Sequence, residues 1–169
     1  MIYTVECNYA DPLSEAQWND FYSLVKLPAL ISVSGFRSSQ RFKALSGTGP
    51  AYLAVHSVDT LAVLQSDEYR HKGGGNFSRW QAHITNWQRN LYAGQDRAKA
   101  VTADERLVVS DHAPHRFIEL GLTPVALHAT ALDKHPAQRW WAKISCIQAK
   151  ALSLQGLNVY QPLTEQLQP

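Results

Sequence analysis

Two histidines among aromatic and basic residues suggest acid–base chemistry on a small organic molecule. A histidine titrates near neutral pH and can exchange a proton with a ligand, while an arginine stabilises negative charge that develops on it. His56 and His83 are therefore candidate catalytic residues, with Arg89 or Arg41 as the stabilising cation. An aromatic ring beside a cation, as in Trp87 and Arg89, suits a phenolic or carboxylate ligand.

Alternation along three expected strands indicates which of these side chains share a face, because successive side chains of a strand point to opposite sides of the sheet. The residues expected to pack against helices are Tyr3, Val5, Cys7, Leu53 and Val55. The residues expected to face a cavity are Thr4, Glu6, Asn8, Tyr52, Ala54, His56, His83, Thr85, Trp87 and Arg89. We predict that Glu6, His56, His83, Trp87 and Arg89 converge on one site.

The first half of the chain should supply strands and helices in the order βαββαβ. Ser14 and Gln17 have the form of a capping box, and the stripe of Trp18, Phe21, Tyr22 and Val25 predicts a helix that ends before a proline. A second helix should begin at a cap on Asp59 and run towards Tyr69. The strands are expected at 2–9, 35–45, 51–58 and 83–92, the middle two forming a hairpin.

The same order repeats after a polar linker at 93–104, and we interpret the chain as a tandem. Further strands are expected at 106–110, 125–133, 139–144 and 157–163, and helices at 113–120 and after a second capping box at Ser145 and Gln148. We therefore expect an α+β fold with two ferredoxin-like βαββαβ repeats, 1–94 and a degenerate 105–169, forming one barrel domain with helices outside. His128, alternating with Thr130, should line the cavity of the second repeat. Trp140 and Trp141 must point opposite ways, one to the core and the other to the cavity or an interface.

Composition excludes several other classes of protein. The 169 residues are 45% hydrophobic and 18% charged, which is too apolar for a disordered chain, and 16 basic and 14 acidic residues in mixed order predict no nucleic-acid partner. No secretion signal or span of ~20 apolar residues is visible, so we expect a cytoplasmic protein that does not enter a membrane. Cys7 and Cys146 are expected to be reduced core thiols. The Asp111, His112 and His115 cluster is too weak a motif to predict a metal site.

Residues 21–43 resemble the EthD-like branch of the dimeric α+β barrel superfamily. The resemblance rests on an aromatic pair, then L-P, G-F and R-F, which here are Phe21 and Tyr22, Leu27 and Pro28, Gly35 and Phe36, and Arg41 and Phe42. Before L-P, where the family usually has a histidine, this chain has Lys26, and after it, in place of the usual glutamate, Ala29. A partly desolvated lysine can act as a base or bind an anion, so Lys26 is a third candidate catalytic residue; the alternative is a surface lysine at a helix end.

The resemblance implies a cofactor-free protein that binds or transforms a small, partly aromatic organic molecule in a central cavity. The alternative is a non-catalytic ligand-binding or structural protein that lacks the family histidine. A tandem chain covers its own sheet and so is expected as a monomer or a homodimer. The run Gly73–Gly75 is expected to be a flexible connection or a cavity lid. The expected binding residues are Glu6, Asn8, Arg41, Tyr52, Trp87, Arg89 and His128.

Overall fold

The structure is a computed structural model that describes residues 1–73 and 77–169. Its first half contains β1 (Ile2–Tyr9), α1 (Glu15–Phe21), η1 (Tyr22–Lys26), α2 (Leu27–Ile31), β2 (Phe36–Ser46), β3 (Tyr52–Val58), α3 (Leu61–Gln65), α4 (Asp67–Lys72), η2 (Ser78–His83) and β4 (Ile84–Ala93). Its second half contains β5 (Glu105–Ser110), α5 (His115–Glu119), β6 (Val125–Leu132), β7 (Gln138–Ser145), α6 (Cys146–Ala151) and β8 (Asn158–Pro162). The expected loop or lid at Gly73–Gly75 lies, apart from Gly73, outside the described residues.

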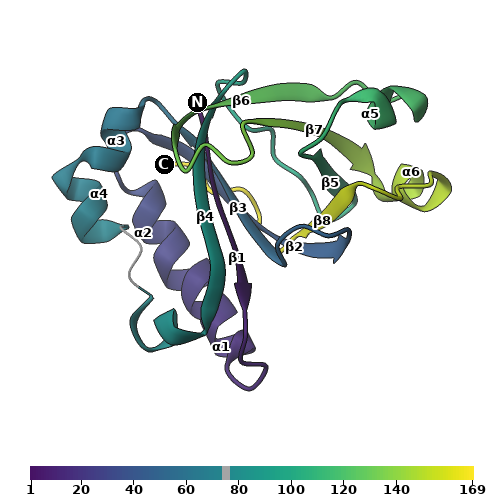
Figure 1. The fold of residues 1–169 in the computed structure, drawn as a ribbon. Coiled ribbons are helices and arrows are strands. Elements are labelled where there is room, and N and C mark those ends of the chain that lie inside the picture. Colours follow the sequence, from purple (N-terminus) through teal and green to yellow (C-terminus); the bar gives the residue numbers. More distant parts are fainter. Residues whose placement is uncertain (74–76) are drawn as a thin grey trace.

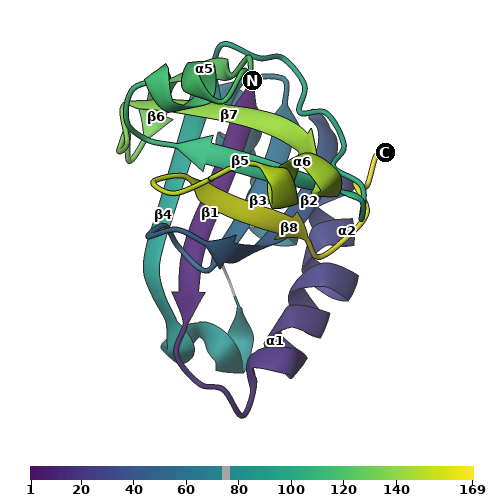
Figure 2. The ribbon, with the colours of Figure 1, turned by 90° about the vertical axis from the view of Figure 1, so that its right-hand side faces the viewer.

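The eight strands form one closed barrel in the order β1-β3-β2-β8-β5-β7-β6-β4, with β4 returning to β1 (Figures 1 and 2). Each neighbouring pair is antiparallel. Within each half, the four strands lie side by side in the order fourth, first, third, second. The α+β class, the β2–β3 and β6–β7 hairpins and barrel closure agree with what the sequence predicts.

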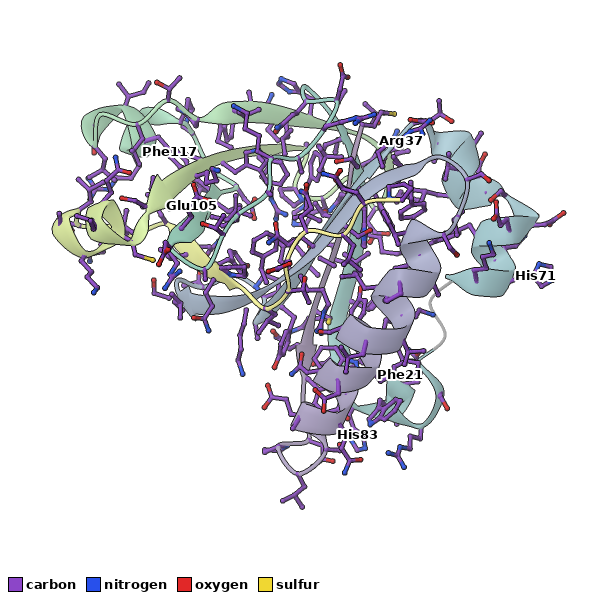
Figure 3. The ribbon with its side chains drawn as sticks, turned by 180° about the vertical axis from the view of Figure 1, so that it is seen from behind. Phe21, Arg37, His71, His83, Glu105 and Phe117 are labelled. Carbon is purple, nitrogen blue, oxygen red and sulfur yellow. The ribbon has the colours of Figure 1, made fainter. Side chains whose placement is uncertain are left out.

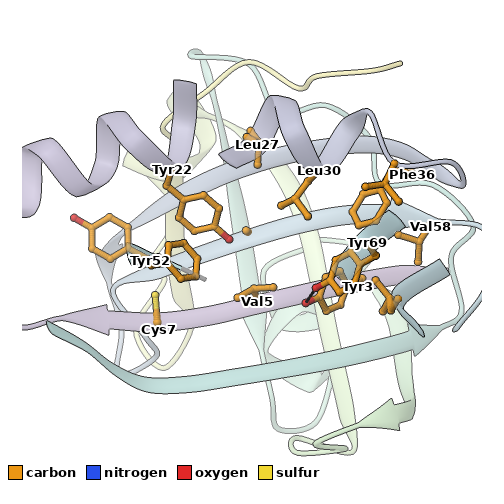
Figure 4. Close-up of a cluster of buried hydrophobic side chains, with 14 of the residues drawn as sticks. Tyr3, Val5, Cys7, Tyr22, Leu27, Leu30, Phe36, Tyr52, Val58 and Tyr69 are labelled. Atoms are coloured by element: carbon orange, nitrogen blue, oxygen red, sulfur yellow. Dashed lines mark hydrogen bonds between the residues drawn. The ribbon is translucent and has the colours of Figure 1, made fainter. Parts of the chain in front are cut away.

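Apolar side chains divide into three layers because each strand has two faces. One cluster lies between the first-half strands and the helices α1, α2 and α4, where Figure 4 shows Tyr22, Leu27 and Leu30 above Val5. A second cluster fills the barrel interior, hereafter the lumen. A third, smaller cluster lies under α5 and α6 on the outside of the second half. The second half has only these two short helices for cover (Figure 1).

The first helix does not end before Pro28, as the sequence predicts, but continues to Ile31 through a π-helical turn, η1. The Leu27 N–H bonds to the carbonyl of Tyr22, five residues back, and this wider turn accommodates a proline that has no N–H of its own. The extra residue also rotates the inward face by one position. Val25, expected in the apolar stripe, is 55% exposed, whereas Lys26 is 8% exposed.

Two predicted helix caps are wrong, and one is confirmed. The Ser14 hydroxyl makes no cap bond and instead contacts Asp11 and Tyr9. Asp59 caps nothing: it pairs with Arg37, and the expected second helix is two short ones, α3 and α4, with Ser66 capping the latter. The capping box of Ser145 and Gln148 is present at α6.

Nearby, Cys146 is half-buried rather than in the core, whereas Cys7 is buried as expected. None of the helices in the described residues is long and apolar enough to span a membrane.

Candidate functional site

A cavity of about 240 Å³ lies at one mouth of the barrel. The chain between β4 and β5, residues 94–104, crosses this mouth, and we call this segment the strap. The side chains that line the cavity are Gln40, Phe42, Val55, Gln95, Ala98, Lys99, Val101, Leu107, Thr123, Val125, Trp141, Ala142, Lys143 and Gln166. Binding sites in barrels commonly occupy such a mouth.

The wall of this cavity is apolar because alternate residues of the strands turn inward. Phe42, Val55, Leu107 and Trp141 all belong to the lumen cluster. Trp141 is 5% exposed and pairs in register with Val109, another lumen residue. Trp140 lies on the opposite face of β7, half-buried against the cluster under α5 and α6. The structure thus decides the open question: Trp141 is the tryptophan that faces the cavity.

Acid–base chemistry has no candidate on this wall. Among the described lining residues none is His, Cys, Asp, Glu or Tyr. The two cations are Lys99, which is exposed, and Lys143, whose ammonium pairs with the Glu105 carboxylate at 2.8 Å. The geometry of this cavity therefore fits binding better than proton transfer.

The other end of the lumen contains a charged cluster built around Arg139. The guanidinium, 2% exposed, donates to Glu6 Oε2 at 2.8 Å and to the two carboxylate oxygens of Asp111 at 2.6 and 3.0 Å. Burial raises the pKa of Glu6, although Arg139 opposes this. Asp111, read from sequence as part of a weak metal motif, is thus engaged by an arginine, and the described residues contain no group of three or more candidate metal ligands.

The predicted faces of β3 and β4 are wrong. In register, Tyr3 lies opposite His56 and Leu91, and Val5 lies opposite Ala54 and Arg89. These side chains therefore share the face that packs on the helices, while Leu53 and Val55 point into the lumen. Glu6 consequently does not converge with His56, Trp87 and Arg89, because the sheet separates them.

Most of the other predicted site residues nevertheless lie on one side of the sheet, the helix-facing side. We call this set the helix-facing layer, and it comprises Lys26, Arg41, Tyr52, His56, Trp87 and Arg89. Alternation thus correctly predicts that Tyr52, His56, Trp87 and Arg89 share one side of the sheet, but that side faces the helices and not the cavity.

His56 is fully buried in this layer. Its Nδ1 lies 2.9 Å from the Ser39 hydroxyl, and its ring stacks on Tyr3 at 5.3 Å and meets the edge of Phe36. Burial lowers its pKa to about 3, so the imidazole is neutral at physiological pH. These are the features of a core residue rather than of a near-neutral general base.

Arg41 is 1% exposed and lies among aromatic rings under α1. Its guanidinium is 4.1 Å from the Tyr22 ring centroid and 5.1 Å from that of Trp18. It donates to the backbone carbonyl of Asn19 at 3.1 Å, to the Asn19 amide oxygen at 2.8 Å and to the Ser23 hydroxyl at 2.8 Å. Tyr52 completes this group, with its hydroxyl bonded to Asn19 and Glu15. Within the described chain, no carboxylate pairs with Arg41.

Lys26 and Trp87 approach the same aromatic ring. The Lys26 ammonium lies 5.1 Å from the ring centroid of Phe77, and Trp87 meets that ring edge-on at 5.3 Å. Burial lowers the pKa of Lys26. Lys26 is therefore a buried cation turned inward by η1, and not the surface lysine that is the alternative interpretation of the sequence.

The remaining predicted residues lie apart. His83 ends η2 rather than lying on β4, and its ring is 5.8 Å from that of Tyr9. Figure 3 shows it far from Glu105 and Phe117. Asn8 accepts a bond from the Ala51 N–H at 2.7 Å. His128 is exposed on the outer face of β6, because its neighbour Leu127 points into the lumen.

Sequence reasoning missed Arg139 and Gln40, since a single arginine or glutamine inside an expected strand carries no motif.

Comparison with known proteins finds neither a matching family model nor a matching curated protein. Two solved structures share the fold over nearly the whole chain. One is an anthrone oxidase-like protein, with a TM-score of 0.57, 11% identity and coverage of 99% of this chain and 92% of that one. The other is named "Putative monooxygenase" and comes from Fusobacterium nucleatum, with a TM-score of 0.56, 11% identity and coverage of 97% and 93%. This protein therefore has the same kind of closed α+β barrel fold as these two proteins.

Proposed function

We propose that this chain is a cofactor-free barrel protein of the EthD-like kind that binds a small, partly aromatic organic molecule in its lumen. The two repeats would be 1–94 and 105–169, each a ferredoxin-like unit covering the sheet of the other. The identical strand order in the two halves supports this division. The resemblance of residues 21–43 to the EthD-like branch supports the family assignment.

The observation that carries the proposal is the cavity under the strap. Its volume of about 240 Å³ suits a compact ligand, and its wall contains the rings of Trp141 and Phe42 with aliphatic side chains between them. A concave, mainly apolar surface with a few polar groups is the usual form of a small-molecule site. The name of the anthrone oxidase-like neighbour supports the choice of a fused-ring aromatic compound as a probe.

The test compares two neighbouring tryptophans, one on each face of β7. Titration calorimetry with anthrone should detect binding to the wild-type protein. Trp141→Ala should weaken this binding on the order of tenfold or more, because an aromatic wall residue is lost. Trp140→Ala removes the same side chain from the outer face and should leave the affinity unchanged. Equal loss in both variants, or no binding to the wild type, would refute the proposal.

A second candidate function is catalysis in the helix-facing layer. The specific observation in its favour is that two cations, Lys26 and Arg41, are buried among aromatic rings there, which suits an anionic or phenolic substrate. The test is anthrone oxidation in air, measured against its spontaneous rate. Turnover that Lys26→Met abolishes, with Lys72→Met on α4 as the exposed-lysine control and circular dichroism as the check on folding, would support it. Turnover that is absent, or equal in both variants, would exclude a role for Lys26.

A further inference from the structure

The three amide side chains that line the lumen cavity, those of Gln40, Gln95 and Gln166, are already engaged in hydrogen bonds that involve the strap. Gln40 is the clearest case, at 1% exposure. Its amide nitrogen donates to the Val101 carbonyl at 2.7 Å and to the Thr164 carbonyl at 2.9 Å. Its amide oxygen accepts from the Val101 N–H at 3.0 Å. Both amide hydrogens of Gln40 are therefore used, one to hold the strap at Val101 and the other to hold the C-terminal tail at Thr164.

The other lining amides are used in the same way. Gln95, on the strap, accepts from Trp141 Nε1 at 2.9 Å and donates to the Arg97 carbonyl at 2.7 Å. Gln166 donates to the Ala98 carbonyl at 3.1 Å. Because the indole N–H is satisfied by Gln95, Trp141 has no polar atom left to offer a ligand and presents only its ring.

The charged lining residues offer a ligand little more. Lys143 donates to the Ala100 carbonyl at 3.1 Å, and Glu105 balances its charge. Lys99 also lines the cavity but is exposed, so its ammonium is already solvated by water. Moving a carboxylate into such a space removes its hydration without providing a buried cation that is not already paired, and an uncompensated buried charge is strongly unfavourable.

We propose that the cavity selects uncharged, largely apolar ring compounds and excludes anions of the same size. This inference deepens the proposed function and depends on it, since it names the ligand class of the same cavity. It also differs from what the helix-facing layer would select, because the buried cations of that layer favour anions.

The test uses two probes of nearly equal shape, 2-methylnaphthalene and 2-naphthoate, in titration calorimetry at pH 7.5. We expect 2-naphthoate to bind the wild-type protein at least about tenfold more weakly, because its carboxylate loses water on entry. Equal or tighter binding of 2-naphthoate overturns the inference about ligand class and leaves the proposed function standing. Absence of binding by both probes, together with anthrone, contradicts the proposed function itself. Binding of 2-naphthoate that Lys99→Met removes places the anion at the rim and also overturns the inference.

A second measurement tests the reason for the selectivity. Gln95→Leu releases the Trp141 N–H as an unpaired donor in the cavity. The variant should then bind 2-acetylnaphthalene, which carries an acceptor, more tightly relative to 2-methylnaphthalene, by about three- to tenfold. Gln166→Leu is the matched control, because it removes a hydrogen bond to the strap but leaves the Trp141 N–H bonded to Gln95. The ratio of the affinities for 2-acetylnaphthalene and 2-methylnaphthalene should therefore stay unchanged. An unchanged ratio in Gln95→Leu would show that the engaged amides do not set the preference.

Discussion

The lumen and the helix-facing layer each bury an arginine, but the two arginines have opposite kinds of partner. In the lumen, Arg139 is held by two carboxylates, those of Glu6 and Asp111. In the helix-facing layer, Arg41 has a similarly small exposure but is held by neutral oxygen atoms and by aromatic faces. A buried ion pair makes each partner costly to remove, whereas neutral partners lose only hydrogen bonds. The comparison teaches that a buried arginine does not by itself identify a binding site: its partners decide whether it is already neutralised.

The largest effect should come from removing the lumen arginine. Arg139→Met leaves two carboxylates without a cation and should lower the free energy of unfolding by about 3–5 kcal/mol. Arg41→Met should cost less, about 1–3 kcal/mol, because only neutral acceptors are left unpaired. Urea denaturation of both variants measures the difference. The Arg139→Met deficit should also shrink as pH falls from 7 to 5, since protonation relieves the unpaired carboxylates. Equal costs at pH 7 would contradict the contrast between the two arginines.

A pH-dependent effect, smaller than that of Arg139→Met near neutral pH, should come from His56. Its pKa is about 3 in the folded protein, well below the ordinary value of 6.5, because burial disfavours the charged ring. Below pH 6.5 His56 therefore binds a proton in the unfolded chain but not in the folded one. The free energy of unfolding then decreases as pH falls from 6.5 towards 3. This contribution amounts to at most about 1.4 kcal/mol per pH unit. His56→Gln should reduce the slope, and His128→Gln, on the exposed face of β6, should not. A slope that His56→Gln leaves unchanged would mean that His56 is hydrated and titrates normally.

The smallest effect tests the register of the π-helical turn. Because η1 turns Val25 to solvent, Val25→Ala should change the free energy of unfolding by no more than about 0.5 kcal/mol. Leu30→Ala, five residues further along the chain in α2 and 4% exposed, should cost about 2–5 kcal/mol. Thermal denaturation at one pH is sufficient for the comparison. A large cost for Val25→Ala would indicate a regular α-helix, with Val25 inward and Lys26 at the surface.

The positions of the strands and the closed barrel could be predicted from the sequence. Which face of each strand turns to the lumen could be predicted for β1 but not for β3. All seven residues of β3 are buried, since one face packs on helices and the other on the lumen. Alternation then distinguishes two faces without saying which is which, so the sequence prediction that Tyr52 and His56 face the lumen is wrong. In β1 the polar residues Thr4 and Glu6 gave the correct assignment. Assigning the more polar face to the lumen is therefore correct for β1 and wrong for β3.

The sequence prediction for the helix that contributes Lys26 is wrong for a different physical reason. A period of 3.6 residues assumes hydrogen bonds four residues apart, and a π turn inserts one residue into that count. The candidate site in the lumen was beyond sequence reasoning, because it is formed by β2, β5 and β7 together with the strap, segments that only barrel closure brings together. Trp141 could be named as one of two alternatives, but only the register with Val109 decides between them.

Closure of the barrel also governs how this protein can meet other chains. Each of the eight strands has a hydrogen-bonded neighbour on both sides, through the β2–β8 and β4–β6 seams that join the halves. An open sheet offers its outer strand as a template on which a foreign strand can add, and edge-to-edge aggregation begins in that way. Within the closed ring no strand offers such a template, but in the described residues the part of β4 from Ile84 to Gln88 pairs with β1 and with no strand on its other side. Association with another protein through the ring itself would therefore use side-chain surfaces, and backbone pairing would be confined to strand ends that extend beyond the ring.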